Sequence, residues 1–260
     1  MDNMQEMNQP TILADANYKA VLNTDYKVAV LPWGATEAHN YHLPYATDNF
    51  QVEYVAKRAA LLAKDTGSDV IVLPCVPFGI NTGQLDVKFC LNILPSTQLV
   101  ILRDLVDVLR RHKIEKLLIL NGHGGNNFKN MIRELSVGYP EVFICWVDWF
   151  RLVDWNQYFD NPGDHAGEME TSVMQHIRPD LVRPLSEAGD GYEKKIPLSG
   201  FKEGWAVTQR QWSKVTADTG VGDPKLATAE KGGKYLDDCI EKLAFFLSEL
   251  DKTANDELYQ

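Results

Sequence analysis

Short apolar segments alternate with longer segments of helical periodicity along most of this sequence. Four runs rich in Val, Ile and Leu have the length of β-strands and end at polar or turn-forming residues. They cover residues 26–31, 69–76, 116–120 and 142–147. Because these runs are apolar on both faces, they predict strands that are buried between two layers of helices.

Five other segments carry apolar residues at the spacing of an amphipathic helix. They cover residues 49–64, 97–112, 126–137, 167–178 and 224–250. The last segment contains Gly232 and Gly233, a pair at which a helix could break.

The alternation predicts an α/β fold in which helices cover both faces of a mostly parallel sheet. We interpret residues 1–260 as a single domain, since one large core suits this length. Residues 181–223 are the least regular part of the chain and are rich in Gly, Pro, Lys and Trp. They are expected to form a hairpin and loop excursion near the functional site.

The composition is typical of a soluble globular protein, with 45% hydrophobic and 24% charged residues. The net charge of −10 and the scattered Lys and Arg argue against a nucleic-acid partner, which requires a clustered basic face. No apolar stretch reaches the roughly 18 residues of a membrane helix, and the first residues do not resemble a secretory signal. We therefore expect a cytoplasmic protein with no membrane partner. Its four widely spaced cysteines are then reduced structural thiols: Cys75, Cys90, Cys145 and Cys239.

The first motif with recognisable chemistry, LPWGATEAHNYHLPYATD, follows the first predicted strand. Ligands of open parallel sheets bind at the carboxyl ends of the strands, so this position favours a functional site. Glu37 and His39 are two residues apart and point the same way in an extended segment, while the Asp48 carboxylate could bridge two cations. His42 is a further candidate donor. Singly, Asp48 could be a helix N-cap and each histidine a surface residue, but together these residues favour metal binding.

Two further motifs are expected at the same edge of the sheet. NGHGGN follows the third strand and places His123 between glycines, which let the backbone approach a ligand closely. DHAGEMETS opens the fourth helical segment and contains His165, Glu168 and Glu170. The two glutamates are two residues apart, so only one can face the site. The structural alternatives are a glycine-rich turn with an incidental histidine and glutamates that merely favour a helix N-terminus.

These donor types indicate the chemistry of the site. Histidine and carboxylate ligands without thiolate suit zinc, manganese or iron. One or two such divalent ions would activate a water, and the resulting metal-bound hydroxide would attack a polarised carbonyl. A free histidine nearby would protonate the leaving nitrogen. A metal-dependent hydrolase is therefore the leading interpretation.

At these residues the sequence resembles the creatininase (creatinine amidohydrolase) family, whose members read PxGxxEQHGxHLP…D, then NGHGGN or a close variant, then HAGxxETS. The resemblance covers most of the chain, including TGVGDPKLATAEKG near its end. It implies a three-layer αβα sandwich, a homo-oligomer that is often a hexamer, and a site for zinc, manganese or iron. The family's metal ligands fall on Glu37, His39, Asp48 and His123. His165 falls on the histidine credited with proton transfer in creatininase.

The chain departs from the family pattern at several places. Creatininase itself has a glutamate two residues after the second-motif histidine, where this chain has Gly125. Glu170 is expected to take that ligand role, with a role as a base also open. Ala38 and Asn40 change the EQHG core, and QLDVKFCLN at residues 84–92 replaces H-x-x-F-P-G-T, which predicts a remodelled pocket. Three tryptophans near the creatininase substrate loop either stack on a planar substrate or belong to the core: Trp146, Trp149 and Trp155.

The sequence thus predicts hydrolysis of a C–N bond in a small non-peptide substrate, either a cyclic amide or a formamide. Creatinine is a weaker candidate than an unidentified relative, because of Gly125 and the altered segment. Two alternatives stay open. One is a lyase or isomerase that uses the same metals, and the other is a non-enzymatic metal-binding protein on the same fold.

Overall fold

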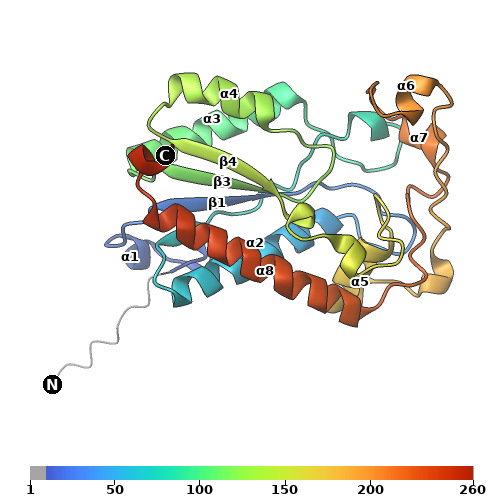
Figure 1. The fold of residues 1–260 in the computed structure, drawn as a ribbon, viewed down its shortest axis with the longest axis horizontal. Helices are drawn as coiled ribbons and strands as arrows, with labels where there is room; N and C mark the ends of the chain where they lie inside the picture. Colours follow the sequence, from blue (N-terminus) through green and yellow to red (C-terminus); the bar gives the residue numbers. More distant parts are fainter. Residues whose placement is uncertain (1–9, 260) are drawn as a thin grey trace.

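The computed structural model describes residues 10–259 and contains a four-stranded sheet with helices on both faces (Figure 1). The strands are β1 (Val28–Trp33), β2 (Val70–Val72), β3 (Lys116–Asn121) and β4 (Phe143–Asp148). They lie in the order β2-β1-β3-β4, and every neighbouring pair is parallel. The predicted α/β class with a parallel central sheet is therefore confirmed.

Helices cover the two faces of the sheet unequally (Figure 1). One face carries α2 (Thr47–Asp65), α5 (Glu168–Ile177) and α8 (Ala229–Lys252), and the other α3 (Pro95–Arg111) and α4 (Lys129–Gly138). A short helix, α1 (Tyr18–Val21), precedes β1. Within β3, Leu118 and Leu120 pack with the first set of helices, whereas Leu117 and Ile119 pack with the second. This double burial explains why the strands are apolar throughout. No helix in residues 10–259 has both the length and the apolar character needed to cross a bilayer.

The carboxyl ends of the strands meet at one edge of the sheet. Trp33 at the end of β1 pairs with Asn121 at the end of β3, and Asn121 pairs with Asp148 at the end of β4. The segments that follow β1 and β3 therefore start side by side. This register brings the first two sequence motifs together, as predicted.

Residues 181–223, all within the described part of the chain, form no strand, so the predicted hairpin is wrong. The segment carries α6 (Ser199–Lys202) and α7 (Trp212–Val215) in a lobe beside the carboxyl edge of the sheet (Figure 1). Its backbone bonds to the rest of the molecule instead of forming a ladder. For example, the Asn40 side chain accepts from Gly189 N–H at 2.8 Å and donates to Gly189 O at 3.2 Å. The Asn40 backbone has a φ of 53°, a left-handed conformation that asparagine tolerates.

Helix α8 continues without a break through Gly232 and Gly233, contrary to the predicted weak point. A Cβ atom at position 232 would lie 2.2 Å from the backbone oxygen of Ser172 in α5. Glycine therefore serves close packing of two helices here, not a break. The helix also begins later than predicted, at Ala229, because the Thr228 side chain accepts from Lys231 N–H and caps it.

Replacing Gly232 with alanine should destabilise the protein by about 1–3 kcal/mol, since the new methyl group would push α8 away from α5. Gly138 in α4 offers the matched control, because no atom lies within 4 Å of a Cβ placed there. Gly138→Ala should be neutral or stabilising by up to about 1 kcal/mol. Urea denaturation measures both variants. Equal stability of the two would contradict the packing explanation.

Candidate metal centre

Three segments bring acidic and histidine side chains to the carboxyl edge of the sheet. Glu37 and His39 lie in the loop after β1, His123 lies in the turn after β3, and Asp48 lies in the first turn of α2. All four side chains are buried. The N-cap of α2 is Ala46, so the structural interpretation of Asp48 as a cap is wrong. Its carboxylate contacts histidines instead.

Backbone carbonyls hold three histidine rings in fixed orientations. Each ring donates from one nitrogen to a carbonyl oxygen: His39 Nδ1 to Glu37 O (3.1 Å), His123 Nε2 to Ile80 O (3.2 Å) and His165 Nε2 to Ala38 O (2.8 Å). The other nitrogen of each ring is then left facing the carboxylates. Such a second hydrogen bond is what fixes the tautomer of metal-binding histidines in proteins.

Asp48 stands between two groups of donor atoms. Its Oδ2 is 3.2 Å from His123 Nδ1, which is also 2.8 Å from Glu37 Oε1. Its Oδ1 is 3.0 Å from His39 Nε2, which is 4.0 Å from Glu170 Oε2. Glu37, Asp48 and His123 thus form one group that could hold a cation, and His39, Asp48 and Glu170 form another.

Opposite charges determine the pKa values in this cluster. Burial alone would raise the pKa of Asp48, but the neighbouring charge of His39 outweighs burial and lowers the pKa. Burial would likewise lower the pKa of His39, but the Asp48 carboxylate raises it to about 10. The pKa of Glu37 is lowered because the charges of His123 and His165 exceed the effect of burial. Burial dominates at Glu170 and raises its pKa.

The donor set fits a divalent cation on two grounds. First, carboxylates this deeply buried require a compensating positive charge. Second, Asp48 Oδ2 is buried and makes no hydrogen bond of good geometry, with only His123 Nδ1 at 3.2 Å beside it, although such atoms are normally satisfied. A cation held beside His123 Nδ1 and Glu37 Oε1 would satisfy that oxygen.

His165 lies next to both groups of donors. Its Nδ1 is 3.8 Å from Glu37 Oε1, and its ring packs at a tilt between those of His39 and Trp212, with ring centroids 4.1 Å and 4.9 Å away. Glu37, His39 and His165 form a third set of atoms that could hold a cation. The geometry therefore allows His165 either to bind metal or to exchange a proton in the pocket.

The structure excludes two other candidates from the cluster. His42 was a candidate donor, but it joins none of the three sets of donors, and its Nε2 is 2.8 Å from Thr171 Oγ1. Glu168 accepts from Asn161 N–H at 2.7 Å and pairs with Lys231 at 2.5 Å, away from the cluster. Of the two glutamates, Glu170 is the one that joins the cluster.

His42 should make the protein less stable as the pH falls. Burial, with a smaller contribution from the charge of His39, lowers the pKa of His42 to about 4, below the ordinary value of 6.5. A lowered pKa means that the stabilising contribution is complete above pH 6.5 and is lost progressively as the pH falls to about 4. His42→Gln, which does not titrate, should therefore lose less stability than wild type between pH 7 and pH 5. Urea midpoints at both pH values test this, and equal losses would refute it.

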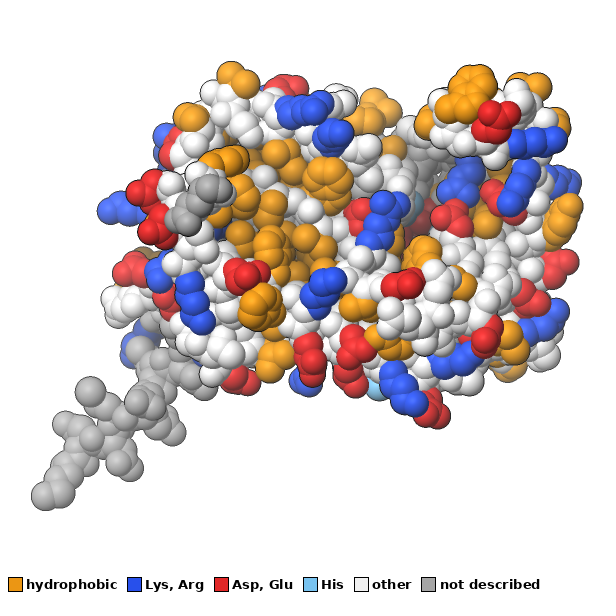
Figure 2. All heavy atoms as spheres, viewed as in Figure 1, with side chains coloured by type: hydrophobic (Ala, Val, Ile, Leu, Met, Phe, Trp, Pro, Cys, Tyr) orange, Lys and Arg blue, Asp and Glu red, His pale blue; other side chains and the backbone are white. Residues whose placement is uncertain are grey.

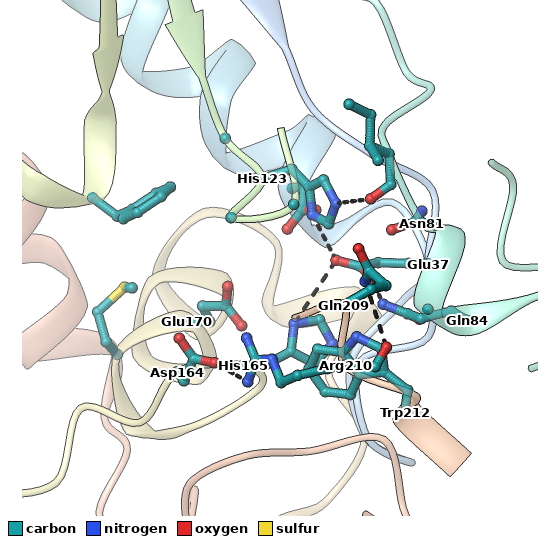
Figure 3. A pocket seen from close by; sticks show the side chains of 18 of the residues that line it. Glu37, Asn81, Gln84, His123, Asp164, His165, Glu170, Gln209, Arg210 and Trp212 are labelled. Carbon is teal, nitrogen blue, oxygen red and sulfur yellow. Dashed lines mark hydrogen bonds and ion pairs between the residues drawn. The ribbon is translucent and has the colours of Figure 1, made fainter. Parts of the chain in front are cut away.

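The cluster forms the floor of a cavity of about 450 Å³ (Figure 3). One wall comes from Asn81 and Gln84, and another from residues 122–125 after β3. Residues 207–210 and Trp212 of the irregular lobe complete the cavity, so part of this excursion lies beside the cluster. Figure 2 shows the surface hollowed beside that lobe.

Sequence reasoning missed the side chains that the lobe contributes. Arg210 lies 4.9 Å above the Trp212 ring and 2.6 Å from the carboxylate of Asp164 (Figure 3). Trp212 also contacts the His165 ring. Because Arg210 and Trp212 come from a segment with no periodic pattern, no local signal indicated them. Of the three tryptophans considered from the sequence, Trp155 lines the cavity and Trp149 is buried in the core.

Gly125 is fixed by the position of His123. A Cβ atom at position 125 would lie 2.4 Å from His123 Nε2 and 2.5 Å from Ile80 O. A glutamate at this position, as in creatininase, would require the loop to rearrange. Glu170 supplies a carboxylate from α5 instead.

The fold and the cluster define an αβα protein with a candidate metal centre at the carboxyl edge of its sheet. A family model described as creatinine amidohydrolase matches residues 14–247, and the chain belongs to this creatininase family. The predicted family membership is thus confirmed.

Three curated relatives indicate the range of the family. The chain is 29% identical to a mycofactocin precursor peptide peptidase of Mycobacterium tuberculosis, over 85% of this chain and 86% of the relative. It is 23% identical to creatinine amidohydrolase of Pseudomonas putida, over 89% of this chain and 93% of the relative. It is 26% identical to a 2-amino-5-formylamino-6-ribosylaminopyrimidin-4(3H)-one 5'-monophosphate deformylase of Methanothermobacter marburgensis, over 86% of this chain and 91% of the relative. All three names describe hydrolysis of a C–N bond.

Solved structures agree with this fold. A Bacteroides fragilis protein provisionally described as a creatinine amidohydrolase is 44% identical, with a TM-score of 0.90 over 97% of this chain and 100% of the other. Creatininase itself is 22% identical, with a TM-score of 0.75 over 94% of this chain and 99% of the creatininase chain. Creatininase structures include a zinc–zinc form and a manganese form.

Proposed function

We propose that this protein is a metal-dependent amidohydrolase that cleaves a C–N bond in a small substrate. The observation that carries the proposal is the position of Asp48, whose two oxygens face two separate groups of donors. The proposed ligands of one or two divalent ions are Glu37, His39, Asp48, His123 and Glu170. Zinc, manganese and iron all suit this mixture of imidazole and carboxylate, and creatininase structures with zinc or manganese support that range.

When bound, such ions polarise a carbonyl oxygen and lower the pKa of water. The side chains of this protein supply the remaining requirements. Asp48 and Glu37 hold negative charge at the floor of the cavity, and residues 207–210 and Trp212 line its side. His165 faces the cavity with one nitrogen tied to Ala38 O, so its Nδ1 is positioned to pass a proton to the departing nitrogen.

The substrate class that we favour is a non-peptide cyclic amide or a formamide. The cavity volume of about 450 Å³ suits a compact ligand, and the creatinine amidohydrolase and deformylase relatives act on such bonds by name. A peptide is the second candidate, because the peptidase relative has the highest identity of the three curated relatives described above.

A panel of amides tests the proposal directly. Purified protein reloaded with zinc, manganese or iron is incubated with cyclic amides, formamides and short peptides, and products are identified by mass spectrometry. Hydrolysis that a chelator abolishes and metal restores is the expected result. Isomerised or eliminated products would instead show a lyase or isomerase. Metal binding without turnover of any compound would favour a non-enzymatic protein.

We also propose that the protein is a cytoplasmic homo-oligomer. Four free cysteines support a reducing compartment.

At the edge of the sheet, β4 has five half-buried residues out of six, and Figure 2 shows a hydrophobic area between α4 and α8. Exposed apolar areas of this kind mark interfaces. Light scattering should give a mass at least twice that of a single chain, and a monomeric mass would refute the proposed assembly.

A further inference from the structure

A closed ring of hydrogen bonds surrounds the Glu37 side chain. Gln84, at the end of the 3-10 helix Thr82–Gln84, is 2% exposed and donates from Nε2 to Glu37 Oε2. Its Oε1 accepts from the Cys90 thiol at 3.0 Å, and Cys90 Sγ accepts from Ala38 N–H at 3.2 Å. Because Ala38 follows Glu37 in the chain, the ring ties the Glu37 carboxylate to its own backbone.

The charge of Glu37 determines which way the Gln84 amide points. An ionised carboxylate accepts hydrogen bonds, so the NH₂ group must face it, and the reversed amide would place two oxygens together. Cys90 favours the same orientation by donating to the amide oxygen. Burial raises the pKa of the Cys90 thiol, so this thiol keeps the proton that it donates.

Packing holds the Gln84 segment in place. A Cβ atom on Gly83 would lie 2.0 Å from the backbone oxygen of Arg210, so the segment and the irregular lobe are in direct backbone contact. On its other side, Asn81 N–H donates to Asn92 Oδ1 at 2.7 Å, and the Asn81 side chain donates to Leu91 O at 3.0 Å. Gln84 therefore projects from a loop that is held by contacts on both sides.

We propose that Gln84 is a positioning residue that aims Glu37 Oε1 at the cation site beside His123, and that Cys90 supports it. With Oε2 tied to Gln84, Oε1 is directed to His123 Nδ1 at 2.8 Å. Outer hydrogen bonds of this kind typically change metal affinity by about 10–100-fold. The inference rests on the proposed function. It assigns a role to residues 84–92, the segment in which this chain differs from the family pattern.

The test measures metal affinity. Apo-protein competes with a chromogenic chelator for Zn²⁺ and, separately, for Mn²⁺. Gln84→Ala should weaken binding about 10-fold or more, and Gln84→Glu at least as much, because a second carboxylate would repel Glu37. Gln98→Ala is the matched control. Gln98 is fully buried, and its side-chain hydrogen bond goes to Asn126 and to no proposed ligand, so this variant should keep an affinity close to wild type while losing stability.

Variants of Cys90 separate positioning from general stability. Cys90→Ser keeps a hydroxyl that can donate to Gln84 Oε1, so its metal affinity should stay close to wild type. Cys90→Ala removes the donor and should weaken affinity in the same direction as Gln84→Ala, with a smaller change. A merely structural role would give equal affinities for both variants, whatever their melting temperatures.

Two results must be distinguished. If His123→Ala loses metal affinity but Gln84→Ala binds metal as tightly as wild type, the role of Gln84 is wrong and the proposed ligand set stands. If neither variant changes the affinity, the ligand set itself is wrong and the role of Gln84 falls with it.

Discussion

Replacing Asp48 with asparagine should lower kcat/KM by about 10³-fold or more, because metal-dependent charge stabilisation is worth several kcal/mol. Asparagine keeps the size of the side chain but removes its charge and turns one of its two acceptors into a donor. That donor would face either His39 Nε2 or His123 Nδ1, the two atoms that Asp48 now joins. One donor group would therefore be disrupted whichever way the amide points.

Asp104→Asn in α3 is the control, since this exposed carboxylate lies outside the cluster. Kinetics use the best substrate from the amide panel, and metal content is measured on the same samples. Asp48→Asn should retain less metal than wild type, whereas Asp104→Asn should match wild type in both measurements. An Asp48→Asn enzyme with full metal and full activity would show that this carboxylate does not join two sites.

His165→Gln should lower kcat by about 10²–10⁴-fold, the usual contribution of a positioned general acid or base. Glutamine can still donate to Ala38 O, the bond that His165 Nε2 now makes, but it cannot carry a proton. The metal content and KM should change little. This combination separates proton transfer from metal binding, which the geometry of His165 also allows.

The control for His165 is His112→Gln, at the exposed end of α3. A His165→Gln enzyme that loses metal together with activity would assign His165 to the ligands. A normal kcat would remove it from the mechanism altogether.

The strands and the three motifs could be predicted from the sequence because their signals are local. A doubly buried strand is apolar along its whole length, and a parallel sheet puts the segments after β1 and β3 at one edge. The prediction of a shared edge therefore needed no tertiary detail. The same reasoning placed Glu37, His39, Asp48 and His123 together.

Features that depend on packing could not be read in this way. Gly232 looked like a break in a helix, but it allows α8 to contact Ser172 of α5. Trp212 contacts His165, and Arg210 lies over Trp212, from a segment without periodicity that is held by contacts such as Asn40 to Gly189. Local patterns contain no information on such distant partners.

The measurement that tests the central claim most directly is elemental analysis of the purified protein by plasma mass spectrometry, with wild type beside His123→Ala. His123 Nδ1 lies within 3.2 Å of both Glu37 and Asp48, so its loss should disable that group of donors. We predict near-stoichiometric zinc, manganese or iron in wild type and clearly less in the variant. A wild-type protein that contains no metal and takes up none when it is added would contradict the account.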